Sequence, residues 1–262
     1  MNFTRLKSAL LVAMTALATT LALTACGQGD TTKNTGTNGE RLIRIATEAA
    51  YPPFNDTSAD GKIVGFDVDV VNAACAKMNA KCEIVAQDWD GLIPGLLTNK
   101  YDAIIAGMSI TPDRLDKVDF SEPYFSNTLV WLTRTDGNFD PNAIKGKVLG
   151  GQRSTTGAAL IQSTYDGKDG NRVQLYDTYN NAYLDMKAGR NDAVMAEKVS
   201  AKEWLKNAGE GIGIVGDELD NSDNLGIAVR KGDTLKAEFD KALNEMKASG
   251  ELANIEAAHF AQ

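Results

Sequence analysis

The chain has 262 residues, of which 43% are hydrophobic, and this is enough for one large domain or two modest lobes. Its formal net charge of −8 at pH 7 argues against nucleic-acid binding. There is a single histidine, His259, and no cluster of cysteines and histidines, so we expect no histidine-based catalysis, no metal site and no cofactor.

Residues 1–25 have the pattern of a secretory signal peptide. A basic start precedes an apolar stretch, residues 9–23, that is too short to span a bilayer comfortably. The sequence Leu-Thr-Ala-Cys-Gly follows and resembles a bacterial lipoprotein cleavage box, in which Cys26 would become the lipid-carrying N-terminus. An ordinary signal peptide with an incidental cysteine is the alternative. Residues 26–40 are rich in Gly, Thr and Asn and predict a flexible tether, so we expect an exported protein anchored by lipid at the cell envelope.

The cysteine count agrees with this prediction. An odd number of cysteines in an exported protein needs an explanation, and lipid on Cys26 would leave Cys75 and Cys82 as a pair. Export permits disulfides, so the two residues are candidates for one. Two free thiols are the alternative.

From residue 42 onward, strands alternate with helices. We expect a strand at 42–47, a loop at 51–55, a hairpin-type turn at Asp60-Gly61, a helix at 65–80, a strand at 82–86 and a helix at 90–99. The first helix would place apolar side chains on one face, four residues apart: Phe66, Val70, Ala74 and Met78. This alternation implies a mostly parallel sheet.

The next stretch, residues 102–114, reads as a buried strand, an exposed turn and a helix that begins at Thr111 and Pro112. Free amides at a helix start attract anions, and Arg114 in the first turn adds a two-pronged donor. Because an arginine there opposes the helix dipole, its placement suggests an anionic partner. A small carboxylate suits this arrangement.

Residues 96–106 and 186–196 echo one another. Each reads as a helix, a basic turn, Asp-Ala and an apolar strand, which predicts two similar α/β lobes; common βα patterning is the alternative. Ligands of open α/β sheets bind beyond the carboxyl ends of strands, so Arg114 and Glu197 would present opposite charges from opposite lobes. Residues 152–157 open a further helix, whose amides and hydroxyls would reach the same carboxylate.

Together these stretches resemble the polar amino-acid-binding proteins of bacterial ABC importers, the family 3 extracellular solute-binding proteins. The resemblance covers roughly residues 43–260. Its motifs follow in order: Tyr-Pro-Pro-Phe at 51–54, Gly-Phe-Asp-Val-Asp at 65–69, Trp-Asp-Gly-Leu-Ile-Pro at 89–94, the stretch 107–114, Val-Asp-Phe-Ser at 118–121, Thr-Thr-Gly at 155–157 and Gly-Arg-Asn-Asp-Ala at 189–193. The spacing of Cys75 and Cys82 is similar to the disulfide of the histidine-binding and lysine/arginine/ornithine-binding members.

The resemblance implies a periplasmic-binding-protein fold of type II. Two α/β lobes, each a mostly parallel sheet flanked by helices, would be joined by two hinge strands. Lobe 1 would comprise residues 41–130 and 226–262, and lobe 2 residues 131–225. The family implies a monomeric binding protein, not an enzyme, that closes on a free L-amino acid and delivers it to the permease of an ABC transporter.

The family also implies how the ligand carboxylate is held. Arg114 matches the arginine that pairs with the α-carboxylate. Ser109 and the backbone at Gly107, with Met108 between them, match the polar cradle. Thr156 matches the carboxylate contact from the second lobe.

The remaining matches concern the rest of the ligand. Glu197 matches the partner of the α-ammonium group, which is usually an aspartate, and Tyr51 and Trp89 match two rings that enclose the side chain. Glu48 matches an acidic position at its far end. A carboxylate beside aromatic faces favours a cation, so arginine, lysine or ornithine is the first choice and histidine the next. Core packing is the alternative for Trp89, and a solvated loop position is the alternative for Glu48. Ala106 departs from the histidine-type members, which have a serine there.

A second hypothesis comes from the same family, which includes periplasmic cyclohexadienyl (arogenate/prephenate) dehydratases. A glutamate in a desolvated cleft has a raised pKa and can act as a general acid, and Glu197 would be that group. Glu48 and the lipid tether fit an importer subunit better.

Overall fold

The structure is a computed structural model that describes residues 41–137, 139–208 and 210–260. The predicted signal peptide (1–25), the lipidation site Cys26 and the tether (26–40) lie outside the described residues. Within the described ranges, no helix combines the length and the apolar character needed to cross a membrane.

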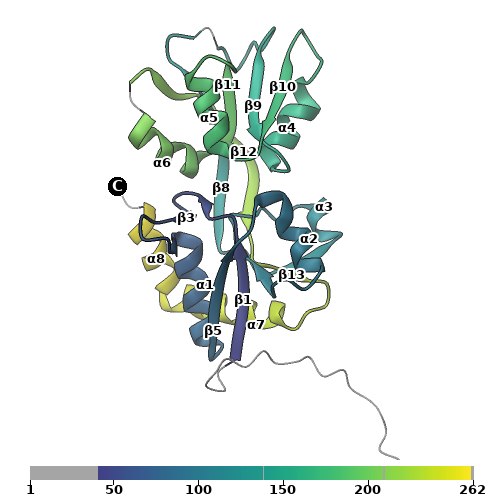
Figure 1. Ribbon diagram of the computed structural model, residues 1–262, viewed down its shortest axis with the longest axis vertical. Helices are drawn as coiled ribbons and strands as arrows, with labels where there is room; N and C mark the ends of the chain where they lie inside the picture. The colour runs from purple at the N-terminus through teal and green to yellow at the C-terminus, as the bar shows by residue number, and fades with distance from the viewer. Residues whose placement is uncertain (1–40, 138, 209, 261–262) are drawn as a thin grey trace, which may run out of the picture. The chain divides into compact units, whose positions relative to one another are not determined.

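Two five-stranded sheets define two lobes (Figure 1). Lobe 1 has the strand order β5 (Ala80–Ala86), β1 (Arg41–Thr47), β6 (Ala103–Ile104), β13 (Ala228–Arg230) and β7 (Val118–Phe120). Lobe 2 has the order β10 (Arg172–Tyr176), β9 (Val148–Gln152), β11 (Ala193–Glu197), β8 (Phe125–Arg134) and β12 (Ile212–Leu225). In each sheet the first three strands pair in parallel, and the fourth is antiparallel to both neighbours. All strands but one therefore point the same way, which is the predicted mostly parallel arrangement.

The strands β8 and β12 are the two hinge strands that link the lobes (Figure 1). They pair antiparallel, from Phe125 opposite Leu225 to Arg134 opposite Ile212. The register shifts on both sides of Leu219, so the ladder contains irregularities, which increase the local bend and twist of a strand.

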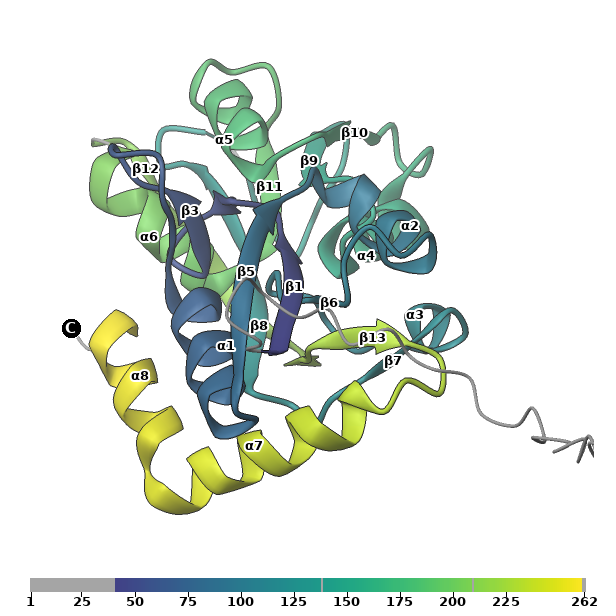
Figure 2. The same ribbon diagram turned by 60° about the horizontal axis from the view of Figure 1, so that its bottom comes forward.

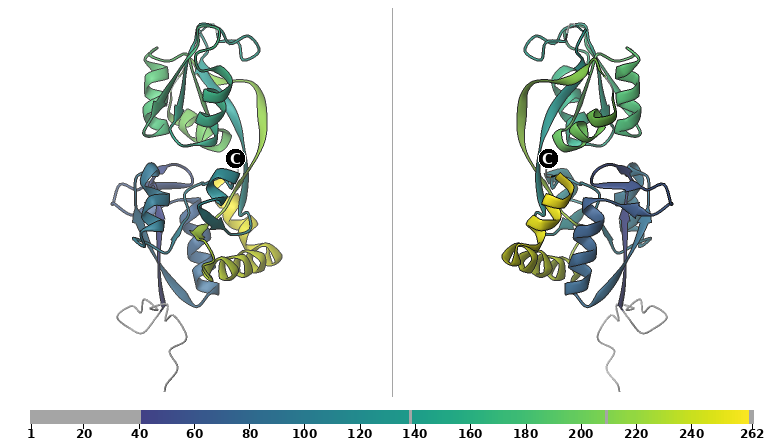
Figure 3. Two further views of the ribbon diagram at one scale, coloured as in Figure 1. Left: turned by 90° about the vertical axis from the view of Figure 1, so that its right-hand side faces the viewer. Right: turned by 90° about the vertical axis from the view of Figure 1, so that its left-hand side faces the viewer.

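Helices cover both faces of the sheet of lobe 1. They are α1 (Phe66–Lys77), η1 (Trp89–Gly91), α2 (Leu92–Leu97), α3 (Pro112–Leu115), α7 (Leu235–Ser249) and α8 (Glu251–Phe260). Figure 2 shows α1 and α8 on one side of β1 and α2 on the other, and Figure 3 shows the yellow helices α7 and α8 together on one side of the lobe. The pleat of β1 explains the layers, because Ile45 packs in the cluster of α1 and α7 while Ala46 packs with Leu96 of α2.

The predicted helix at 65–80 is α1, and its predicted apolar face is buried, with Met78 partly buried at its end. Gly65 precedes it with φ of 129°, where an added Cβ would lie 2.4 Å from the carbonyl oxygen of Phe54. The helix ends earlier than predicted because Asn79, with φ of 49°, turns the chain into β5. Cys75 of α1 and Cys82 of β5 are joined by a disulfide, with their Cα atoms 6.0 Å apart.

Lobe 2 carries the helices α4 (Thr156–Tyr165), α5 (Tyr179–Lys187) and α6 (Lys198–Ala208). The threonines that precede α4 and α5 cap them, because each side chain accepts from a backbone N–H in the first turn. A small antiparallel sheet of β2 (Ala50–Tyr51), β3 (Asn55–Thr57) and β4 (Ile63–Val64) belongs to lobe 1, and the predicted Asp60-Gly61 turn joins its last two strands.

The sequence echo corresponds to a repeated structure. In lobe 1 the Asp102 carboxylate accepts from the backbone N–H of Arg44 (2.9 Å), and its own N–H donates to the carbonyl of Arg44 (2.8 Å). In lobe 2 Asp192 makes the same two bonds with Val148, at 2.7 Å each. Each aspartate thus fixes the register of a parallel strand pair.

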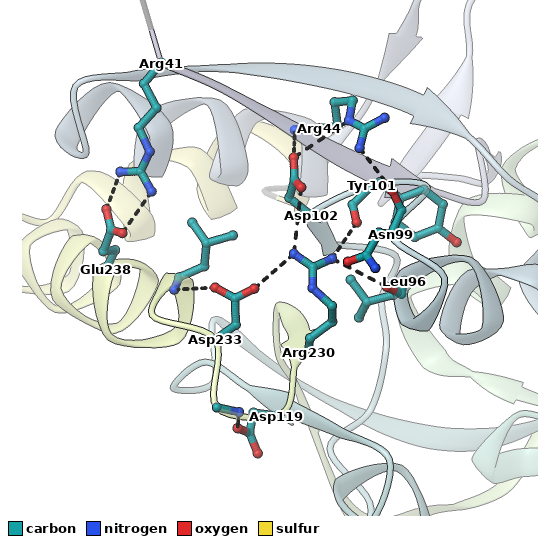
Figure 4. Close-up of polar contacts among 12 residues, drawn as sticks. Arg41, Arg44, Leu96, Asn99, Tyr101, Asp102, Asp119, Arg230, Asp233 and Glu238 are labelled. Atoms are coloured by element: carbon teal, nitrogen blue, oxygen red, sulfur yellow. Dashed lines mark hydrogen bonds and ion pairs between the residues drawn. The ribbon is translucent and has the colours of Figure 1, made fainter. Parts of the chain in front are cut away.

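An arginine completes each repeat. Arg230 of β13 and Arg134 of β8 lie on the antiparallel strand beside β6 and β11, respectively. Arg230 donates to the carbonyls of Leu96 and Tyr101, as Figure 4 shows, and Arg134 donates to those of Met186 and Asn191. Both pairs of acceptors are related by the same shift of 90 positions, since 186 − 96 and 191 − 101 both equal 90. The echo therefore describes two lobes built alike.

Candidate functional site

The carboxyl ends of four strands, two from each lobe, meet around one small cavity. Glu48 follows β1, Gly107 follows β6, and Gln152 and Glu197 are the last residues of β9 and β11. The space left inside the cavity is only about 10 Å³. This is about the volume that one water molecule needs, so the lining side chains are packed close together with the lobes in this arrangement. Both lobes contribute carboxylates, rings or polar groups to its lining: Glu48, Tyr51, Trp89, Ala106, Gly107, Gln152, Thr155, Tyr179 and Glu197.

Gln152 connects the two lobes at Glu48. Its side chain, 2% exposed, donates from Nε2 to Oε1 of Glu48 (2.6 Å) and to the carbonyl of Asp177 (2.9 Å). Burial raises the pKa of Glu48 to about 7; the bond from Gln152 opposes the rise, and the charge of Glu197 adds to it. A cation that enters the cavity would favour the ionised form of Glu48.

Glu197 lies beside two tyrosines. Tyr51 of lobe 1 donates from its hydroxyl to Oε2 of Glu197 at 3.0 Å, which is a second contact between the lobes. The ring of Tyr179 lies 5.8 Å from that of Tyr51, and its hydroxyl donates to Oγ1 of Thr155 at 3.3 Å. Burial and the nearby Glu197 carboxylate raise the pKa of both tyrosines well above the usual value, so their hydroxyls remain donors.

Arg114 lies at the mouth of the cleft. The predicted helix start is present, because the Thr111 side chain accepts from the Arg114 N–H and Pro112 is the first residue of α3. The guanidinium lies over Trp89, 5.3 Å from the ring centre, and donates to the carbonyls of Ser109 (2.8 Å) and Ser154 (2.9 Å). Ser154 belongs to lobe 2, so this arginine also bridges the lobes.

A buried carboxylate supports the turn after β6. Oδ2 of Asp67 accepts from the N–H of Gly107 and from Asn55, both at 2.8 Å, and Oδ1 accepts from the hydroxyl of Tyr124 at 2.7 Å. Burial raises the pKa of Asp67 to about 6, and these three bonds oppose the rise. Gly107 has φ of 57°, and a Cβ there would lie 2.8 Å from the ring of Tyr51. The conformation of this turn is thus set by the hydrogen bond to Asp67 and by the lack of a side chain at Gly107.

The structure brings most of the predicted site residues together, in two places. Five of them line the cavity: Glu48, Tyr51, Trp89, Gly107 and Glu197. Met108 and Arg114 line an adjacent outer groove of about 510 Å³, which Trp89 shares. Ser109 supplies a carbonyl to Arg114, and Thr156 begins α4 beside the lining residue Thr155.

Three polar lining residues were absent from the predicted set: Gln152, Thr155 and Tyr179. Gln152 and Thr155 lie within the stretch 152–157 that the sequence had indicated. Tyr179 occupies the position 90 residues after Trp89, so an extension of the echo would have found it.

The repeat relates other lining residues as well. Ile45 of β1 and Leu149 of β9 pair with equivalent alanines of β6 and β11, so Glu48 and Gln152, three residues further on, occupy equivalent strand ends. Gly107 and Glu197 are also 90 positions apart. The strand ends around the cavity are therefore equivalent in the two lobes, but their side chains differ in charge. Glu48 is equivalent to the neutral Gln152, and Gly107 is equivalent to Glu197.

Among the described residues, no group of three or more His, Cys, Asp or Glu side chains is placed to hold a metal ion. The cavity lining contains two carboxylates and neither a lysine nor an arginine. Its chemistry is that of a receptor for cationic groups.

Comparisons with known proteins agree with this chemistry. A model of the family "Bacterial extracellular solute-binding proteins, family 3" matches residues 43–262. An L-arginine-binding protein of Pseudomonas aeruginosa is 38% identical over 230 residues, which is 84% of this chain and 88% of the relative. A lysine/arginine/ornithine-binding periplasmic protein of Escherichia coli is 34% identical over 227 residues, covering 83% and 87% of the two chains.

A comparison of structures also finds an arginine-binding protein. The solved structure of an ancestral arginine-binding protein bound to arginine superposes with a TM-score of 0.77 at 36% identity, covering 84% of this chain and 98% of that one. The strand order, the two hinge strands and the paired-lobe cavity are thus accompanied by similarity over nearly all of the described residues. The chain belongs to the bacterial extracellular solute-binding proteins, family 3.

Proposed function

We propose that the protein binds a free L-amino acid with a cationic side chain, arginine first and then lysine or ornithine, with histidine next. The observation that carries this proposal is the pair of carboxylates, Glu48 and Glu197, that line one small cavity from opposite lobes. A cationic α-amino acid offers two positive groups, its α-ammonium and its side chain. Charge-assisted hydrogen bonds in a site shielded from water are strong, so a ligand of this class complements both carboxylates.

Each end of the ligand then has its own partners. Glu48 would accept from the side-chain cation, and Glu197 from the α-ammonium group. The rings of Tyr51, Trp89 and Tyr179 would enclose the aliphatic part and add cation–π attraction. The α-carboxylate would point toward the mouth of the cleft, where Arg114 lies, with Ser109, Met108 and the Gly107 backbone on one side and Thr156 on the other.

We infer further that the protein acts as the ligand-binding subunit of an ABC importer. Lobe 1 (41–130 and 226–262) and lobe 2 (131–225) would close on the amino acid, and a membrane permease would receive it. Relatives are described as periplasmic, and the lipoprotein-like sequence at Cys26 supports anchoring of the exported monomer by lipid. The disulfide between Cys75 and Cys82 fits an oxidising compartment.

The dehydratase hypothesis fits the site less well. The second carboxylate of the cavity, Glu48, has no role in that hypothesis, whereas a cationic amino acid would use both carboxylates. The named relatives reported above are binding proteins. We therefore treat the chain as a binding protein and not as an enzyme.

Calorimetric titration of the soluble domain, from about residue 40, tests the proposal directly. The protein is first unfolded and refolded to remove carried-over ligand and is then titrated with arginine, lysine, ornithine, histidine and glutamine. We expect a dissociation constant of about 1 μM or below for arginine, equivalent to roughly −8 kcal/mol. Binding of glutamine alone would contradict the role of Glu48, and no binding of any of them would contradict the proposed ligand class.

A further inference from the structure

A group of polar contacts closes the mouth of the cleft outside the cavity. The hydroxyl of Ser154 in lobe 2 donates to Oδ1 of Asp90 in lobe 1 at 2.8 Å, and its carbonyl accepts from Nη2 of Arg114 at 2.9 Å. Arg153 lies 3.6 Å from Oδ2 of the same Asp90. We call Asp90, Arg114, Arg153 and Ser154 the mouth clasp.

The backbone of Ser154 has a conformation that is unusual for a serine. Its φ of 60° lies in the left-handed region, which is unfavourable for residues other than glycine. The residue lies between the end of β9 at Gln152 and the helix cap Thr155. In this conformation the hydroxyl and the carbonyl of Ser154 both reach lobe 1. Strained residues of this kind are frequent at ligand clamps.

The clasp acts on the same side chain that is proposed to hold the ligand carboxylate. The Arg114 guanidinium is fixed by two carbonyls, that of Ser109 in its own lobe and that of Ser154 in the other. Asp90 is the neighbour of Trp89, on which the guanidinium is stacked. The Ser154–Asp90 bond therefore holds the carbonyl of Ser154 close to Trp89, on which the guanidinium of Arg114 is stacked.

We propose that Ser154 and Asp90 are positioning residues that act through Arg114 and slow the release of the amino acid. This inference rests on the proposed function, in which Arg114 pairs with the α-carboxylate. Contacts between lobes form only when the lobes are together, so they act after the ligand has entered. Their loss should raise the dissociation rate constant and leave the association rate constant unchanged.

The contribution of each member follows from its geometry. The Ser154 hydroxyl makes a bond of normal length to a carboxylate, but the bond is exposed to solvent, so its loss should raise the dissociation rate about 2- to 5-fold. The Arg153–Asp90 pair is longer and both side chains are half exposed, so it should contribute little. Arg153 has a second partner, Asp177 of its own lobe, at 2.5 Å.

Stopped-flow measurement of arginine binding tests the clasp, with Ser154→Ala, Asp90→Ala and the double variant. We expect each single variant to dissociate about 2- to 5-fold faster. The double variant should dissociate at about the rate of a single variant, because both substitutions remove the same bond. Ser154→Gly, which retains the left-handed backbone and the carbonyl, should behave like Ser154→Ala. Asp177→Ala, which removes the partner of Arg153 within lobe 2, is the matched control and should dissociate like the wild type.

A second ligand separates a positioning role from a general loss of structure. L-Argininamide lacks the carboxylate that Arg114 would hold, so the clasp variants should weaken its binding much less than that of arginine. An equal effect on both ligands, a change confined to association, or strictly additive effects in the double variant would overturn the inference. Unchanged dissociation of arginine from the variants would overturn the clasp alone, whereas failure of the wild type to bind any cationic amino acid would overturn the proposed function with it.

Discussion

At the scale of single residues, Glu48 has the most informative chemistry. It is nearly buried and accepts a bond from Gln152, and its pKa is raised to about 7, mainly by burial. A cationic ligand would bind the ionised carboxylate. Binding below pH 7 must then release a proton, because the ligand-free site is mostly protonated there.

We therefore expect the affinity for arginine to decrease as the pH is lowered. Below pH 7 the dissociation constant should rise toward about tenfold per pH unit, since one pKa unit corresponds to about 1.4 kcal/mol. Titrations in buffers of different ionisation enthalpy will count the released protons. Glu48→Gln should weaken arginine binding by about 2 kcal/mol or more at pH 8 and should flatten the pH dependence. A pH dependence that survives in this variant would assign the titration to another group.

Glu48→Gln, which should weaken arginine binding, should stabilise the fold in the absence of ligand. The pKa of Glu48 is 4.5 by its ordinary value and about 7 in the fold, so the native state binds more protons between these limits. The free energy of unfolding therefore falls as pH rises from about 4.5 to about 7, and the loss is complete above pH 7. In the absence of ligand, Glu48→Gln should be more stable than wild type at pH 8, by about 3 kcal/mol with the lobes together and by less once they separate and Glu48 meets solvent. Urea unfolding at pH 5 and pH 8 checks this, and equal stabilities at pH 8 would contradict it.

At the scale of elements, the turn between β6 and α3 shows how tightly the site is constructed. Gly107 combines a left-handed backbone with close approach to Tyr51, at 2.8 Å for an added Cβ. We expect Gly107→Ala to lower the free energy of unfolding by about 2–4 kcal/mol, from backbone strain and overpacking together. Gly146→Ala is a matched control, because Gly146 has φ of 66° but no atom within 4 Å of an added Cβ. It should lose only about 1 kcal/mol, and equal losses would exclude the contact with Tyr51 as a cause.

The disulfide between α1 and β5 should contribute to stability without affecting the ligand. It closes a loop of sequence separation 7, which corresponds to about 2–3 kcal/mol on the chain-entropy model. Replacing Cys75 and Cys82 by serine should therefore lower Tm by about 5–10 °C. Arginine affinity should remain unchanged, because neither cysteine lines the cavity. A wild-type protein whose Tm does not respond to reductant would argue for free thiols.

The elements that the sequence predicted well are those with strong local patterns. The strand β1, the helix α1 and the capped start of α3 combine periodic apolar residues with glycine, threonine or proline at their ends. Two hinge strands were predicted, but the full length of β12 was not, because its polar sequence lacks alternation and its strand form depends on pairing with the distant β8. For the same reason Gln152 was missed: its role depends on Glu48, which is 104 positions earlier and belongs to the other lobe.

At the scale of the whole molecule, the charges in the cavity should control closure. Glu48 and Glu197 come from different lobes, and their repulsion contributes to the raised pKa of Glu48. Bringing the lobes together thus buries two acids in one small space, which costs free energy unless a cation enters or one acid is protonated. A ligand shifts the equilibrium only by its differential affinity for the closed form, and a doubly cationic amino acid supplies that difference.

Small-angle scattering should therefore report an expanded protein at pH 8 without ligand and a more compact one with arginine. Without ligand, the protein should also become more compact between pH 8 and pH 5.5, because Glu48 takes up a proton in that range. Glu48→Gln should be compact at both pH values, since its cavity contains one acid fewer. If arginine leaves the radius of gyration unchanged, the lobes do not close on it. If arginine compacts the protein while Glu48→Gln remains expanded, closure depends on contacts of the ligand and not on relief of the repulsion between the two acids.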